Sequence, residues 1–142
     1  RDKSNVALHV SLAEMSLEAA RTNFDWSNDK FAGSYVVEWA VENVNSPGDW
    51  EMGARDVIRL HQGQGKFDKT TTGIPGNAEQ REALKIVYGG ASGEIEISGP
   101  LGLFEAERTY HTEFIGNLKD GELNTIWQEG DRIKIRLQKL EN

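Results

Sequence analysis

The chain has 142 residues, the length of one ordinary domain, and this is enough to bury a core without a disulfide or a metal. Its 23 acidic and 16 basic residues give a formal net charge of −7, which argues against nucleic-acid binding because DNA and RNA are polyanions. The chain has no cysteine, which excludes disulfide frameworks, thiolate metal sites and cysteine nucleophiles.

The first residue is Arg1 and not methionine. A removed secretion signal would explain this start, as would excision from a longer protein. We therefore expect an extracellular or periplasmic protein. We expect no membrane span, because no stretch approaches the ~18 consecutive apolar residues that a membrane helix needs.

Residues 6–21 carry two competing patterns. Every second residue from Val6 to Leu12 is apolar, which is typical of a strand with one buried face. Leu12, Met15 and Ala19 also lie on one helical stripe, and the residues between 12 and 20 have high helix propensity. The pattern predicts a strand over 6–12, followed by a short helix or a bulged strand over 13–21.

A hairpin is predicted over residues 35–62. In the first strand, 35–44, aromatic and aliphatic residues alternate with Glu38 and Glu42. The turn follows at 45–49, where Pro47 fixes φ and Gly48 can take a positive φ. The second strand is expected over 50–62.

Residues 63–77 are rich in glycine and threonine and are predicted to form a long irregular loop. Asn77 can cap a short helix after it, because apolar residues between Ala83 and Tyr88 share one helical face and Gly89 can end that helix. A strand over 83–88 is the alternative, favoured by Ile86, Val87 and Tyr88.

The second half reads as short strands with alternating polarity, expected over 93–98, 103–115, 123–128 and 131–140, with hairpin turns at 117–121 and 129–131. The charges of the last strand, Arg132, Lys134 and Arg136, resemble those of an edge strand protected against pairing. We therefore predict one mainly β domain over 1–142, a single antiparallel β-barrel or β-sandwich with one or two short helices.

The strand over 103–115 holds the candidate catalytic residues. Glu107, His111 and Glu113 share one face, and such a row can perform acid–base chemistry inside a barrel with a wet lumen. The alternative is a solvated outer face on which these residues form exposed ion pairs. Alternation alone does not say which face is inside.

The sequence predicts no metal site and no cofactor. His9, His61 and His111 each lie on the polar face of a predicted strand, but no two of them have the close spacing of metal ligands. Asp25, Ser27 and Asp29 have the spacing of the first three ligands of a calcium loop. The glycine and glutamate that an EF-hand requires at the sixth and twelfth positions are missing.

Two of the four tryptophans lie at polar turns, each next to an aspartate: Trp26 with Asp25 and Trp50 with Asp49. An aromatic ring can stack on the C–H face of a sugar while a carboxylate accepts hydrogen bonds from its hydroxyls. These four residues are the candidate ligand-binding site. The alternative for each tryptophan is a lid that closes one end of the sheet.

Three functions remain open. The first, which we favour, is a non-catalytic domain that binds a small molecule, a carbohydrate or a protein. The second is a small β-barrel enzyme that uses Glu107, His111 and Glu113 in a polar lumen. The third is a structural or assembly subunit. The sequence leaves the oligomeric state open.

Overall fold

The computed structural model describes residues 22, 24–42, 45–102, 109–124 and 132–140. Within these residues no helix is long and apolar enough to cross a membrane. The elements in chain order are η1 (Trp26–Asn28), β1 (Gly33–Glu42), β2 (Trp50–His61), β3 (Gln64–Lys69), α3 (Ala78–Glu82), β4 (Lys85–Tyr88), β5 (Glu94–Leu101), β6 (Tyr110–Asn117), β7 (Glu122–Asn124) and β8 (Arg132–Lys139).

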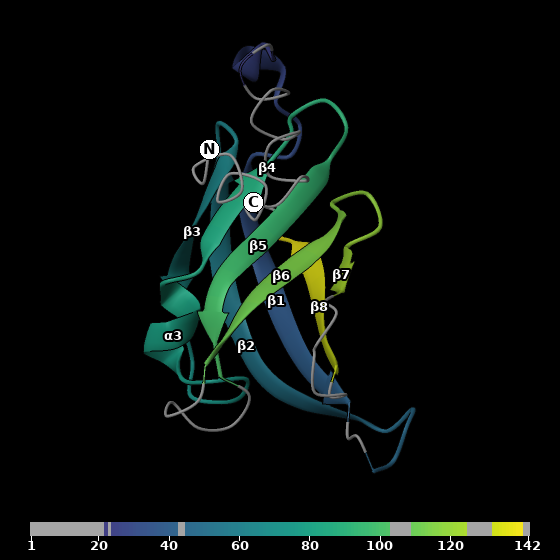
Figure 1. Ribbon diagram of the computed structural model, residues 1–142. Helices are drawn as coiled ribbons and strands as arrows, with labels where there is room; N and C mark the ends of the chain where they lie inside the picture. Colours follow the sequence, from purple (N-terminus) through teal and green to yellow (C-terminus); the bar gives the residue numbers. More distant parts are fainter. Residues whose placement is uncertain (1–21, 23, 43–44, 103–108, 125–131, 141–142) are drawn as a thin grey trace, which may run out of the picture.

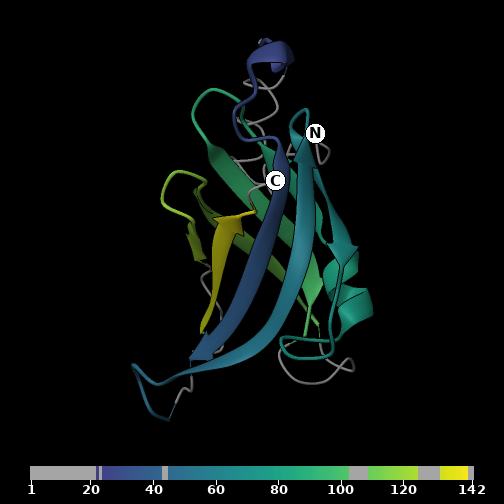
Figure 2. The same cartoon turned by 180° about the vertical axis from the view of Figure 1, so that it is seen from behind.

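The eight strands form a closed antiparallel barrel (Figure 1). Each strand pairs with the next one along the chain, and β8 pairs back with β1 over Tyr35–Glu42. From behind, β8, β1 and β2 lie side by side as one continuous wall (Figure 2). Of the two predicted architectures, the barrel is therefore the one that forms.

Side chains fill the interior, as expected for eight strands. The predicted alternation of β1 is confirmed: Tyr35, Val37, Trp39 and Val41 are buried. Trp39 meets Phe114 of β6 across the barrel, with ring centroids 5.5 Å apart and the planes at 84°. Such an edge-to-face pair is favourable beyond its buried area.

The predicted irregular loop over 63–77 is wrong in its first half. Gln62 and Gly63 both take a positive φ, 49° and 86°, and turn the chain directly back into β3. Two consecutive positive φ values suit the right-handed twist of a hairpin. The short strand was obscured because only Gly65 and Phe67 face inward among polar and charged neighbours.

Both alternatives for the segment after Asn77 occur, one after the other. Asn77 accepts a hydrogen bond from the backbone N–H of Gln80 at 2.8 Å and closes a capping box around α3. The chain then leaves the helix and enters β4 at Lys85. The predictions for 6–21, 103–108 and 125–131 lie outside the described residues.

The prediction that the last strand is a protected edge is wrong. β8 is hydrogen-bonded to β1 on one side and to β7 on the other. Its alternating charges therefore mark the solvent side of a central strand. Alternation reports only that one face is wet, and an edge strand and a barrel strand share that property.

A β-bulge interrupts β2 at Gly53. Trp39 pairs with Ala54 and Ala40 pairs with Met52, so Gly53 is the extra residue. A Cβ on Gly53 would lie 2.1 Å from the carbonyl oxygen of Ile74, which explains why glycine stands there. The bulge shifts the alternation, and Met52 and Trp50 turn to the outer face.

One end of the barrel is closed by a buried ion pair between Asp56 of β2 and Arg81 of α3. The Nε of Arg81 lies 2.8 Å from Oδ2 of Asp56, and both side chains are fully buried. Asp56 also accepts hydrogen bonds from the indole Nε1 of Trp39 at 2.9 Å and from the backbone N–H of Thr71 at 3.0 Å. The carboxylate is therefore satisfied from three directions.

The remaining donors of Arg81 hold the loop between β3 and α3. Nη1 donates to the carbonyl oxygens of Gly73 at 2.8 Å and Pro75 at 2.9 Å, and Nη2 donates to that of Thr71. A guanidinium presents five N–H donors in a fixed fork, and here the fork joins the loop to the barrel wall.

Replacing Arg81→Met is expected to lower the free energy of unfolding by about 3–5 kcal/mol, because it leaves the Asp56 carboxylate buried without its partner. Arg59→Met is the matched control: Arg59 pairs with Asp68 at 3.3 Å on the exposed surface, and its loss should change the value by less than about 1 kcal/mol. Urea unfolding measures both. Equal small losses would contradict a structural role for the buried pair.

Candidate functional site

Trp26 closes the end of the barrel opposite to the Asp56–Arg81 pair. Its ring lies edge-on to Phe24 (4.7 Å between centroids) and to Tyr88 (5.6 Å), and it packs against the buried core. Asp25 caps η1, accepting hydrogen bonds from the backbone N–H of Ser27 at 3.1 Å and its hydroxyl at 2.7 Å. These contacts correspond to the lid alternative for this tryptophan.

Two buried tyrosines lie beneath this lid. The Tyr88 hydroxyl donates to Oδ2 of Asp29, and the Tyr35 hydroxyl donates to the carbonyl oxygen of Phe31 at 2.7 Å. Burial raises the pKa of Tyr35 to about 12, with a smaller contribution from the charge of Asp29. Burial, followed by the hydrogen bond to Asp29, also raises the pKa of Tyr88.

Trp50 and Asp49 lie at the other end of the molecule, where β2 begins after the turn. Trp50 pairs with Glu42, the last residue of β1, whereas Trp26 precedes the first residue of that strand. The four predicted ligand-binding residues therefore do not form one site. Whether either pair binds a ligand stays a prediction.

His111 and Glu113 lie on the outer face of β6. Their neighbours Thr112 and Phe114 are buried in the interior, and the His111 Nε2 is 3.7 Å from Glu113 Oε1 at the surface. These two side chains do not line the lumen. Glu107, the third predicted catalytic residue, lies outside the described residues.

The described parts of the chain contain no cluster of three potential metal ligands. His61 ends β2 near the turn to β3, and His111 is the second residue of β6, at the opposite end of the barrel. Asp29, the third residue of the partial calcium motif, accepts hydrogen bonds from the backbone N–H of Phe31 at 3.0 Å and from Tyr88. Its oxygens thus fasten the lid. His9 lies outside the described residues.

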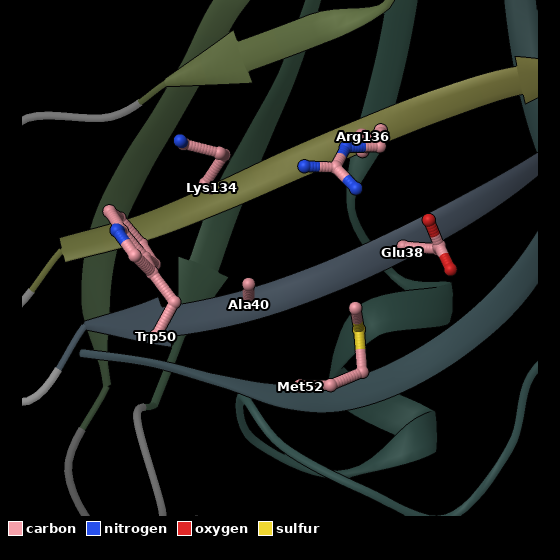
Figure 3. Close-up of a pocket in the computed structure, with 6 residues that line it drawn as sticks. All are labelled: Glu38, Ala40, Trp50, Met52, Lys134 and Arg136. Atoms are coloured by element: carbon pink, nitrogen blue, oxygen red, sulfur yellow. The ribbon is translucent and has the colours of Figure 1, made fainter. Parts of the chain in front are cut away.

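The structure instead brings six side chains together on the outer wall formed by β8, β1 and β2 (Figure 3). They line an open depression of about 210 Å³, called the outer pocket from here on. Its lining residues are Glu38 and Ala40 from β1, Trp50 and Met52 from β2, and Lys134 and Arg136 from β8.

The strand register explains why these residues meet. Met52, Ala40 and Lys134 form one cross-strand row, with the small Ala40 in the centre. In the next row towards the lid end, Glu38 lies between Arg55 and Arg136. Directly opposed side chains in such rows are close enough to interact.

The groups of the outer pocket are partly engaged with one another. Lys134 Nζ lies 4.7 Å from the centroid of the Trp50 ring, within the range of a cation–π interaction. Glu38 is 3.9 Å from Arg55. Below the pocket Glu42 pairs with Arg132 at 3.3 Å and accepts the backbone N–H of Gly48 at 2.8 Å.

Among the six lining residues, the sequence singled out Trp50 as a candidate. Lys134 and Arg136 were predicted to belong to a charged edge strand, and no sequence pattern indicated a role for Met52. Their meeting depends on the pairing of β8 with β1 and on the bulge at Gly53, both of which involve residues far apart in the sequence. The one local signal was the exposed-strand pattern of alternating cations in 132–136.

No protein-family model matches the chain, and a search of curated proteins finds no similar sequence.

Replacing His111→Ala or Glu113→Ala is expected to change the free energy of unfolding by less than about 0.5 kcal/mol, because their contact is long and exposed. Urea unfolding of the two variants beside the wild type measures this. A loss above about 2 kcal/mol from either one would show that the pair is part of a tightly packed site.

Alkaline pH is expected to destabilise the barrel through Tyr35 and Tyr88. Since their pKa values are raised above the usual value of 10.0, the folded state keeps these protons while the unfolded chain loses them. The free energy of unfolding should therefore fall as the pH rises through 10 towards 12.

Urea unfolding at about pH 8 and about pH 11 tests this dependence. The double variant Tyr35→Phe and Tyr88→Phe should lose less stability between the two pH values than the wild type does. An equal loss would assign the alkaline sensitivity to other groups, such as the lysines.

Proposed function

We propose that this protein is a non-catalytic binding domain and that the outer pocket is its binding surface. The observation that carries the proposal is the convergence of an indole and an exposed methionine from β2 with two cationic side chains from β8, on either side of β1. Met52 is 56% exposed, the most exposed large apolar side chain among the described residues. A few apolar groups with convergent polar ones are the usual composition of a binding site.

The distribution of side chains inside the barrel supports an external site. The interior is occupied by large side chains that pack across it, such as Trp39 and Phe114. Arg81 and the loop it holds fill one end, and Trp26 with its tyrosines fills the other. A ligand that binds without unfolding either end would therefore meet the surface, where the outer pocket and a second depression of about 430 Å³ beside Gly73, Asn77 and Glu79 lie open.

The outer pocket supports binding of a partner better than stacking of a carbohydrate. Lys134 Nζ already lies over the Trp50 ring, so that face of the indole is not open to a sugar. The volume of about 210 Å³ is also below the roughly 300–1,000 Å³ that is typical of pockets for drug-sized ligands.

Site-specific photocrosslinking tests the proposal. Met52→p-benzoylphenylalanine places a photoreactive ketone in the outer pocket, and the matched control Lys119→p-benzoylphenylalanine places it on the exposed turn between β6 and β7. After irradiation in the cells that make the protein, a discrete crosslinked product is expected from position 52 and not from position 119.

Mass spectrometry identifies the crosslinked molecule. The same pattern of products from both positions, or none from position 52, would refute the outer pocket as the binding surface. Circular dichroism of both variants confirms that each has kept the fold of the wild type.

A further inference from the structure

The outer pocket has an excess of positive charge inside an acidic protein. Glu38 is engaged by Arg55, and within the described residues Lys134 and Arg136 form no ion pair with a carboxylate. The chain as a whole has a formal charge of −7. Because charges beyond about 8 Å are largely screened at physiological ionic strength, a bound group meets the local cations and not the net charge.

The apolar half of the outer pocket is small and specific in shape. Ala40 forms its floor, and Trp50 and Met52 rise on one side from β2. Ala40 is opposed by Met52 and Lys134, whose larger side chains leave a hollow above its methyl group.

The strand pairing around the outer pocket indicates that a partner would bind to projecting side chains and not to a free strand edge. β1 is hydrogen-bonded along its length to β2 on one side and to β8 on the other. A partner cannot therefore add a strand at this place and must engage the projecting groups. Tryptophan, methionine and arginine are enriched at protein–protein interfaces and supply much of their binding energy.

We infer that the outer pocket docks an acidic segment of a partner protein. One apolar side chain of the segment lies over Ala40 against Met52 and the indole of Trp50. Carboxylates on the β8 side of it pair with Lys134 and Arg136. This inference rests on the proposed function and adds the chemistry of the occupant.

The positions of the charged side chains in the outer pocket determine where the acidic residues of the bound segment lie relative to its apolar residue. Lys134 and Arg136 both project from β8, and Met52 and Trp50 project from β2 across β1. The acidic groups are therefore expected on the β8 side of the apolar anchor. Glu38, at the rim beside Arg136, should repel a carboxylate placed on the β1 side of that arginine.

Selection from a random peptide display library on the immobilised wild type tests the inference. The enriched peptides are expected to share an apolar residue with aspartate or glutamate on one side of it. Synthetic copies are then measured by fluorescence anisotropy against the wild type and against the double variant Lys134→Glu and Arg136→Glu. Affinity for that variant should fall at least about tenfold, since opposed charge pairs become repulsive.

The matched control is the double variant Lys66→Glu and Lys119→Glu, which changes the net charge equally at exposed positions outside the outer pocket. It should change the affinity by less than about threefold, as expected for charges more than a Debye length away. Met52→Ser should lower the affinity for the peptide without changing how that affinity depends on salt, because the substitution removes only the apolar contact.

Four results would overturn the inference. The first is enrichment of peptides without acidic residues, and the second is an equal loss of affinity in the control variant. The third is displacement of the selected peptide by sub-millimolar phenylacetate, which would assign the pocket to a small carboxylate. A partner crosslinked at position 52 through a segment without acidic residues would overturn the inference while leaving the proposed function intact.

Discussion

The fold depends on one buried carboxylate. Asp56 lies on the inner face of β2, where an unpaired charge would be strongly destabilising, and three elements supply its donors: Trp39 from β1, Thr71 from the loop after β3, and Arg81 from α3. Satisfying Asp56 brings Arg81 into the barrel end, and Arg81 then fixes the loop through the carbonyl oxygens of Gly73 and Pro75. The loop over 70–77 thus closes this end of the barrel, with Ile74 packed against the core.

The same constraint reaches the outer surface. The loop that Arg81 holds brings the Ile74 carbonyl so close to β2 that residue 53 has no room for a Cβ. The strand bulges at this glycine, and beyond the bulge Met52 and Trp50 turn outward beside Lys134. The inner network and the outer pocket are therefore built on the two faces of one short stretch of β2, and the rigid interior supports the exposed apolar groups.

The two barrel ends are closed by different chemistry. At one end the guanidinium of Arg81 joins the Asp56 carboxylate to backbone carbonyl oxygens of the loop between β3 and α3. At the other end Trp26 packs edge-on against Tyr88, whose hydroxyl donates to Asp29. The second end contains buried tyrosine hydroxyls with raised pKa values, so the free energy of unfolding is expected to fall at alkaline pH. Because both ends are filled by these groups, the depressions that remain open to another molecule lie on the surface.

The sequence by itself determined the local features: strands predicted over 35–44, 50–62 and 131–140 occur over 33–42, 50–61 and 132–139, and the turn at Pro47-Gly48 and the cap at Asn77 occur as predicted. These are set by one-sided burial and backbone preferences over a few residues, so neighbouring amino acids suffice to predict them. The tertiary structure decided closure of the barrel, the inward role of Arg81 and the bulge at Gly53, because each depends on segments that are distant in sequence. For that reason alternation correctly predicted a wet face on β8, whereas only the pairing of β8 with β1 placed its cations beside Trp50 and Met52.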